Sequence, residues 1–106
     1  FVAAREKPVL NDITVEEAKR LGFEKVAEKV VPVGWFIGIF FNEFVNTEFL
    51  RIFDRVDLVI AKGMAAYESL TEYEFDKPVY IILMAKCRSV ANHLGVPRGS
   101  YVIKKL

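Results

Sequence analysis

The sequence has little cysteine and no long uninterrupted apolar run, and each absence excludes a class of protein. Cys87 is the only cysteine among 106 residues, so no disulfide can form within the chain, and we expect a reducing, cytoplasmic origin. The longest uncharged apolar run, Val30 to Phe41, contains a proline and two glycines and is far shorter than the ~20 residues that span a bilayer. The first eight residues lack the basic start and apolar stretch of a signal peptide. We therefore expect neither secretion nor a membrane span.

An excess of charge of one sign is also missing. Fifteen basic and fourteen acidic residues leave a formal net charge of +1, so the overall field attracts neither nucleic acid nor an anionic membrane. Hydrophobic residues make up 53% of the chain and charged residues 27%, a balance typical of a packed domain with a soluble surface. We expect one domain, residues 1–106. Because Phe1 opens directly on a strand-like segment, we expect this domain to be excised from a larger protein.

Apolar runs alternate with helical patterns along the whole chain, which predicts an α/β fold. Right-handed crossovers would place helices on both faces of a mostly parallel sheet, giving a Rossmann-like three-layer sandwich. The predicted strands lie near residues 1–5, 26–33, 57–61, 79–85 and 101–103, and the predicted helices near 14–21, from a turn at 34–38 to about 55, and near 64–70 and 89–93.

Local signals set several of these boundaries. Thr14 followed three residues later by Glu17 predicts a capping box at the start of the first helix. Ser89 is the predicted cap of the last helix, and Gly95 is its predicted end. The apolar run Val79–Ala85 has no polar alternation, which predicts a central strand covered on both faces.

Polar groups follow three of the predicted strands. They are Asn11-Asp12, Lys62-Gly63 and Lys86-Cys87. In sheets of this kind ligands bind beyond the carboxyl ends of the strands. A carboxylate at that edge can hold a hard cation, and a lysine beside a glycine turn can neutralise a phosphoryl oxygen.

Four segments carry a resemblance to a known family. Pro8–Thr14, Asp57–Met64, Ala85–Cys87 and Val90–Val96 are similar in order and spacing to segments of the damage-control phosphatases. The resemblance implies a metal-dependent phosphatase that acts on sugar phosphates and related phosphorylated metabolites, with a divalent cation such as manganese or nickel. It also implies that Asp12 is a metal ligand and that Lys62, helped by Lys86, contacts the substrate phosphate.

Two departures from the family pattern argue against activity. The other metal ligands of the family, an Asp-Asn pair, would lie before Phe1, and Ala66 stands where the family has a functional asparagine. We therefore interpret Asp12, Lys62 and Lys86 as vestigial. For Asp12, an equally weighted alternative is that it shapes a turn. For Lys86, an equally weighted alternative is that it is an ordinary surface lysine. For Lys62, that alternative is weaker than the vestigial interpretation. Cys87 is expected to be an inert, buried thiol.

The segment from Gly34 to Val45 is rich in aromatic residues. In a helix, Phe41, Val45, Phe49, Ile52 and Val56 would form a stripe facing the sheet. Further apolar residues fall outside this stripe, and an apolar patch that extends beyond the core stripe is more often an interface than an accident. The predicted binding anchors are Trp35, Phe36, Ile39, Phe40 and Phe44. The alternative is that other parts of the protein cover these side chains.

These observations lead to one preferred function and two alternatives. The preferred hypothesis is a non-catalytic, engineered protein-binding module without a cofactor, which binds another protein or itself through the aromatic patch. The first alternative is a metal-dependent phosphatase fragment whose site is completed by another chain. The second is a structural fragment that self-associates through its exposed aromatic residues.

Overall fold

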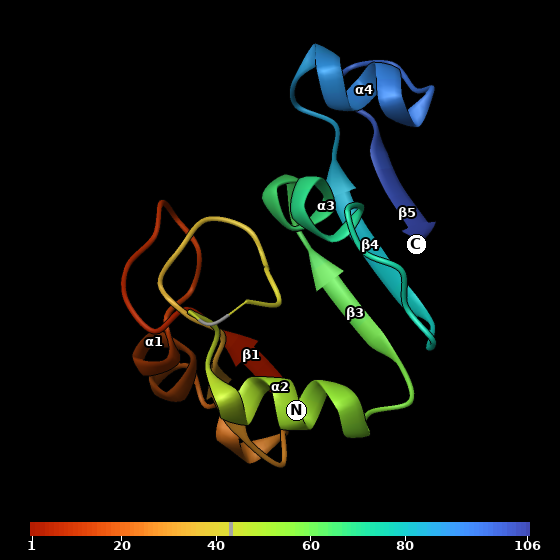
Figure 1. The fold of residues 1–106 in the computed structure, drawn as a ribbon. Helices are drawn as coiled ribbons and strands as arrows, with labels where there is room; N and C mark the ends of the chain where they lie inside the picture. The colour runs from red at the N-terminus through yellow and green to blue at the C-terminus, as the bar shows by residue number, and fades with distance from the viewer. Residues whose placement is uncertain (43) are drawn as a thin grey trace. The chain divides into compact units, whose positions relative to one another are not determined.

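A computed structural model describes residues 1–42 and 44–106. The chain divides into two compact units, Phe1–Val56 and Asp57–Leu106. Both units are built around a parallel pair of strands connected through a helix (Figure 1). The prediction of a single domain over residues 1–106 stays a prediction.

The first unit pairs β1 (Val2–Ala4) with β2 (Val30–Pro32) in parallel, with Val2 opposite Val30. The connection between them contains α1 (Val15–Arg20) and a short 3₁₀ helix, η1 (Phe23–Lys25). The helix α2 (Thr47–Arg55) follows β2. Two apolar clusters stabilise this unit. One joins Ala4, Ala18 and Val30, and the other joins Val31, Val33, Val45 and Phe49.

The second unit is a three-stranded sheet in the order β3-β4-β5. The strand β3 (Val59–Lys62) leads into α3 (Met64–Leu70), which packs against both β3 and β4 (Val79–Met84). The strands β3 and β4 are parallel. The helix α4 (Arg88–Leu94) and a tight return then lead to β5 (Tyr101–Lys105).

The α/β class with parallel strands is confirmed, but β5 is antiparallel to β4. The reason is local: the amide of Gly99 donates to the carbonyl of Ala85 at 2.8 Å, and the Ala85 amide donates to the Ser100 carbonyl at 2.9 Å. These bonds return the chain beside the end of β4, so β5 has to run back along it.

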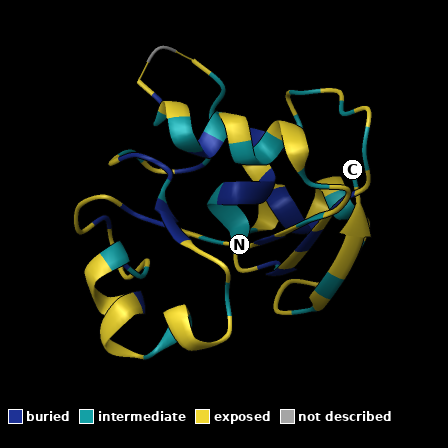
Figure 2. Cartoon of the chain, turned by 90° about the horizontal axis from the view of Figure 1, so that it is seen from below, coloured by how far each residue is buried: buried dark blue, intermediate teal, exposed yellow. Residues whose placement is uncertain are grey.

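The prediction that Val79–Ala85 is covered on both faces is wrong for this structure. The strand β4 is central, but its residues alternate between buried and exposed, with Ile81 fully buried and Tyr80 and Ile82 exposed. Most of the neighbouring β5 is exposed as well (Figure 2). The apolar run encodes one face under α3 and a second apolar face that no helix of this unit covers.

The helix predicted from the 34–38 turn begins only at Thr47, and Glu43 within the predicted range lies outside the described residues. Gly38 has a φ of +84°, a conformation that does not belong to a right-handed helix. The cap of α2 is Asn46, whose side-chain oxygen accepts hydrogen bonds from the amides of Glu48 and Phe49 at 2.9 and 3.4 Å. Asparagine is among the preferred N-cap residues, so α2 starts after Asn46 although the apolar periodicity begins earlier.

The capping box at Thr14 is confirmed. The Glu17 amide donates to Thr14 Oγ1 at 3.2 Å, and the Thr14 amide donates to Glu17 Oε2 at 2.8 Å. The predicted cap at Ser89 is wrong, because α4 starts at Arg88 and Cys87 Sγ accepts from the Val90 amide at 3.5 Å. Gly95 ends α4 in the left-handed conformation, as predicted.

No helix within the described part of the chain is long and apolar enough to cross a membrane.

The capping box gives a prediction about acid stability. We expect Thr14→Ala to lower the free energy of unfolding by about 1 kcal/mol at neutral pH, because the first turn of α1 loses its cap. The Thr14 amide and hydroxyl lower the pKa of Glu17 from its ordinary value of 4.5. The bonds from Thr14 to the ionised Glu17 carboxylate are therefore present above pH 4.5 and are lost as the pH falls through the folded-state pKa. The variant removes only the hydroxyl bond among them, so only that part of the difference between wild type and variant shrinks in acid, whereas the loss of the cap on the Glu17 amide persists.

Urea unfolding followed by circular dichroism at neutral and acidic pH measures this difference. The matched control is Thr47→Ala, which removes an exposed hydroxyl from the first residue of α2, where Asn46 is the cap. An equal effect of both variants would contradict the capping role of Thr14.

Candidate functional site

Asp12 lies in the connection between β1 and α1, in a tight turn. The Asp12 amide donates to the Val9 carbonyl at 3.0 Å, and Leu10 at the centre of the turn has a φ of +51°. Among the residues that the structure describes, Leu10 is the one non-glycine residue with a positive φ, and it is 80% exposed. A non-glycine residue in this region stores strain, and such strain is common beside functional groups.

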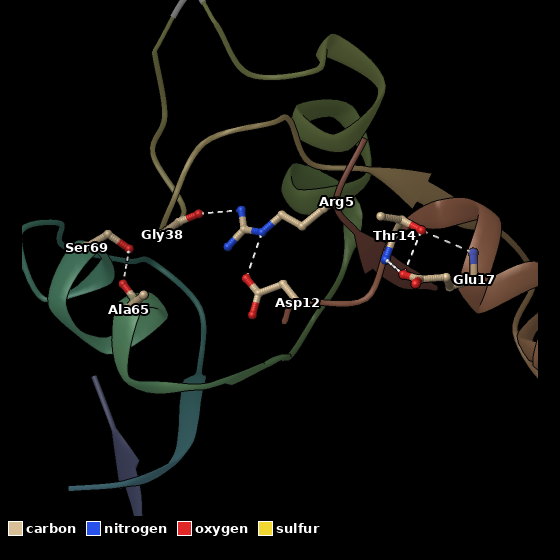
Figure 3. A network of polar contacts seen from close by, with 7 residues as sticks. All are labelled: Arg5, Asp12, Thr14, Glu17, Gly38, Ala65 and Ser69. Carbon is tan, nitrogen blue, oxygen red and sulfur yellow. Dashed lines mark hydrogen bonds and ion pairs between the residues drawn. The ribbon is translucent and has the colours of Figure 1, made fainter. Parts of the chain in front are cut away.

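The Asp12 carboxylate is paired with Arg5. Arg5 Nε donates to Asp12 Oδ2 at 2.9 Å, and the two side chains are 8% and 47% exposed, respectively. Arg5 Nη1 donates to the Gly38 carbonyl at 2.6 Å (Figure 3). Asp12 Oδ1 has no hydrogen-bond partner among residues 1–42 and 44–106. Sequence reasoning did not identify Arg5, because an arginine at the end of a strand is usually solvated.

Asp12 also lines an open hollow of about 520 Å³ on the first unit. Its charged lining residues are Asp12, Glu17 and Arg20. Glu17 Oε2 is held by Thr14, which lowers the pKa of Glu17, and Arg20 pairs with Glu16. Two carboxylates therefore face this hollow, and each has one oxygen already committed to a protein donor.

These groups do not by themselves fit a divalent cation. A hard cation takes about six oxygen ligands, and Asp12 already shares its charge with a buried guanidinium. Across the part of the chain that the structure describes, no three Asp, Glu, His or Cys side chains come together as a possible metal site. Asp12 can be one ligand of such a site but cannot form the site alone.

Lys62 lies at the carboxyl end of β3 in the second unit and is exposed. Gly63 caps the following helix α3 with a φ of +107°, and a Cβ built on it would meet no heavy atom within 4 Å. The backbone at Gly63 is therefore open to close approach by a ligand, beside a cationic side chain. A lysine with this placement can contact an anionic oxygen.

Lys86 follows the neighbouring strand and is also exposed. Lys62 pairs with Ile82, so Lys86 lies four residues, or ~13 Å of extended chain, beyond the point opposite Lys62. Both lysines therefore lie at the carboxyl ends of neighbouring parallel strands, but Lys86 lies farther along the strand direction than Lys62. Cys87, predicted to be a buried thiol, is only half-buried and caps α4.

The residue that departs from the family pattern, Ala66, is buried in α3. Next to it, Tyr67 is fully buried, burial raises the pKa of its phenol, and its hydroxyl lies 3.3 Å from Nδ1 of the exposed His93. Both positions are committed to packing in this unit. The nearby buried Ser69 hydroxyl donates to the carbonyls of Ala65 and Ala66 at 2.9 and 3.2 Å, within α3 itself.

The five predicted aromatic-patch residues do not share one environment. Trp35 and Phe44 are 57% and 63% exposed, whereas Phe36 and Ile39 pack against the core cluster of Val31, Val33, Val45 and Phe49. Phe40 is half-buried, and its ring contacts that of Phe36 edge-on at 5.7 Å. Ile37, which was not among the predicted anchors, is 55% exposed. Binding through this patch stays a prediction.

The fold and these groups define a class: an α/β protein whose polar candidates follow parallel strands and include a Lys-Gly turn at a helix start. Comparison with known families gives the particular family. Residues 1–102 match the model of the damage-control phosphatase ARMT1-like domain, and the chain belongs to this family.

Three archaeal relatives are similar over nearly the whole chain. An uncharacterised protein of Methanocaldococcus jannaschii is 48% identical over 93% of this chain and 33% of its own length. A damage-control phosphatase of Pyrococcus horikoshii is 40% identical over 96% of the chain and 35% of its own length. A damage-control phosphatase of Archaeoglobus fulgidus is 37% identical, over 94% and 34%. The chain therefore spans about a third of the length of these relatives.

A solved structure agrees with this assignment. The crystal structure of a DUF89 family protein from P. horikoshii superposes on 97% of the chain with a TM-score of 0.88 and 38% identity, and the match covers 35% of that protein. The family resemblance inferred from sequence is confirmed. These relatives favour the phosphatase alternative over the non-catalytic binding module, and none of them supports an engineered origin.

The strained turn beside Asp12 gives a second prediction. We expect Leu10→Gly to raise the free energy of unfolding by up to about 1 kcal/mol, because relief of left-handed strain exceeds the added entropy of the unfolded chain. The matched control is Leu21→Gly, since Leu21 is 71% exposed but has a φ of −75°. That variant should be destabilised by ~0.5–1 kcal/mol. Urea unfolding of both variants measures these changes. A similar decrease in the free energy of unfolding for Leu10→Gly and Leu21→Gly would exclude strain at Leu10.

Proposed function

We propose that this chain provides one part of a phosphatase site that acts on phosphorylated metabolites and is completed by residues outside the chain. The observation that carries this proposal is the match of residues 1–102 to a phosphatase family, together with an exposed Lys62 beside the open Gly63 turn. Two of the relatives, from P. horikoshii and A. fulgidus, are damage-control phosphatases, which supports the same reaction class.

In this proposal Lys62 contacts the phosphate. Its ammonium group neutralises charge on a nonbridging oxygen, and the absence of a side chain at Gly63 allows that oxygen to approach the start of α3. Such electrostatic stabilisation accounts for much of the catalysis of phosphoryl transfer. Lys86, which leaves the same edge of the sheet, adds positive charge farther along it.

Asp12 contributes a carboxylate with one oxygen, Oδ1, free of hydrogen bonds among the described residues. The family resemblance assigns this position to a divalent cation such as manganese or nickel. Because the groups present in this chain do not fit a cation alone, we assign the remaining ligands to residues outside it.

A chimera tests the proposed function. In it, this chain replaces the matching third of the P. horikoshii phosphatase, and release of inorganic phosphate from sugar phosphates is measured with added Mn²⁺ or Ni²⁺. We expect Lys62→Ala to reduce the rate about 100-fold, in line with the loss of one charge-stabilising group. The matched control, Lys104→Ala, removes an exposed lysine from β5 and should retain the rate. Equal rates in the two variants, or a chimera without activity, would refute the proposal.

The alanine at position 66 gives a separate prediction. We expect Ala66→Asn to raise the rate of the chimera, because it restores the amide that the family pattern has three residues after the glycine. In the isolated chain the same change should lower the free energy of unfolding by ~1–3 kcal/mol, because Ala66 is only 5% exposed and a buried amide needs partners.

The control for this variant is Ala65→Asn, at the adjacent half-buried position of α3. Phosphate release and urea unfolding are measured for both variants. If Ala66→Asn left the rate at or below that of the unmodified chimera, the absence of this amide would not explain any loss of activity.

A further inference from the structure

Arg5 contacts two segments that are far apart in the sequence. Its Nε donates to the carboxylate of Asp12, and its Nη1 donates to the carbonyl of Gly38, 33 residues away (Figure 3). The turn at Asp12 and the aromatic segment are therefore joined through one guanidinium group. Arg5 lies directly after β1, so this group is attached to the parallel strand pair.

The main chain of Arg5 strengthens the same connection. The Arg5 amide donates to the Ile13 carbonyl at 2.9 Å, and the Arg5 carbonyl accepts from the Val15 amide at 2.9 Å. Backbone bonds thus place the segment after Asp12 along Arg5, while the side chain holds Asp12 itself. The adjacent Glu6 amide donates to the Gly34 carbonyl at 2.9 Å, which places the start of the aromatic segment beside the same strand end.

The burial of the two partners is unequal. The Arg5 side chain is 8% exposed and that of Asp12 is 47% exposed. A buried guanidinium is stable only while its charge is compensated. Arg5 therefore depends on the Asp12 carboxylate more strongly than the carboxylate depends on Arg5. Removal of Asp12 would leave a buried unpaired cation, whereas removal of the Arg5 charge would leave a carboxylate that water can solvate.

We infer that Arg5 is a positioning residue that fixes the Asp12 carboxylate and the aromatic segment at Gly38 as one clasp. The consequence of this clasp for catalysis rests on the proposed function, but the clasp itself does not. It assigns Asp12 a structural role as the counter-ion of Arg5, in addition to any role as a ligand. It also makes the conformation of residues 35–42 depend on Asp12.

The first experiment measures hydrogen–deuterium exchange in the chain and in four variants: Arg5→Met, Arg5→Lys, Asp12→Ala and the double variant Arg5→Met/Asp12→Ala. We expect the amides of Asp12 and of residues 35–42 to exchange at least tenfold faster in Arg5→Met, while the amides of β2 stay unchanged. Arg5→Lys should behave like Arg5→Met, because the single nitrogen of an ammonium group cannot replace the two guanidinium nitrogens that bond Asp12 and Gly38.

The matched control is Arg20→Met, which removes an exposed arginine paired with Glu16 in the same unit. This variant should leave the exchange of residues 35–42 within twofold of wild type. If Arg5→Met did no more than Arg20→Met, the clasp would be excluded.

The second experiment uses the unequal burial of the pair. Asp12→Ala should lower the urea midpoint, and adding Arg5→Met in that background should recover part of the loss, because the unpaired buried cation is removed. Exchange of residues 35–42 should remain fast in the double variant, since the Gly38 bond is still absent. Additive losses of stability would overturn the inference.

Asp12→Asn provides a comparison that does not depend on the folding of any Arg5 variant. Its amide oxygen still accepts from Arg5 Nε, so residues 35–42 should exchange more slowly than in Asp12→Ala. Equal exchange in these two Asp12 variants would contradict the hydrogen bond from Arg5 Nε as the link between Asp12 and residues 35–42.

The chimera separates the clasp from the proposed function. We expect Arg5→Lys to lower kcat at least tenfold with little change in KM, because Arg5 orients a reacting group and does not touch the substrate. An unchanged kcat would refute the positioning role. A wild-type chimera without activity would refute the proposed function alone, and the exchange and unfolding results would still decide the clasp.

Discussion

Parallel pairing of neighbouring strands is the constraint on which both units depend. Two parallel strands cannot be joined by a tight turn, so each pair needs a crossover, which α1 provides between β1 and β2 and α3 provides between β3 and β4. The same geometry determines where polar groups can gather. Lys62 is the last residue of β3, whereas Asp12 lies in a turn of the connection that follows β1.

Much of the fold could be predicted because local signals and tertiary packing agree. Thr14 and Glu17 form the capping box that their spacing indicates, and α3 occupies the predicted residues 64–70. Disagreement arises where two signals compete. The apolar period from Phe41 to Val56 predicts one long helix, but the Asn46 cap and the positive φ of Gly38 restrict the helix to Thr47–Arg55. Likewise, the direction of β5 depends on backbone hydrogen bonds to Ala85, which no sequence pattern predicts.

The candidate site was predicted less completely than the fold. Lys62 and Lys86 are found at or just beyond the ends of strands, but Asp12 lies in a turn eight residues after β1. The partner of Asp12 could not be derived from spacing, because a strand-end arginine is usually solvated. Burial of Arg5 depends on contacts with residues 7 and 33 positions away. The aromatic segment shows the same limit. Composition identified it, but only packing separates the exposed Trp35 and Phe44 from Phe36 and Ile39, which contact the core.

The two roles of Asp12 constrain each other. A ligand that needs only Oδ1 can use this carboxylate while Oδ2 stays on Arg5, and the buried guanidinium remains compensated. A ligand that takes both oxygens has to displace Arg5, which leaves a cation in an environment where charge is expensive. That cost extends beyond the turn, because the same guanidinium holds the Gly38 carbonyl. Any completed site built on this chain therefore has to accept Asp12 as a one-oxygen donor, or else rearrange the aromatic segment when its ligand binds.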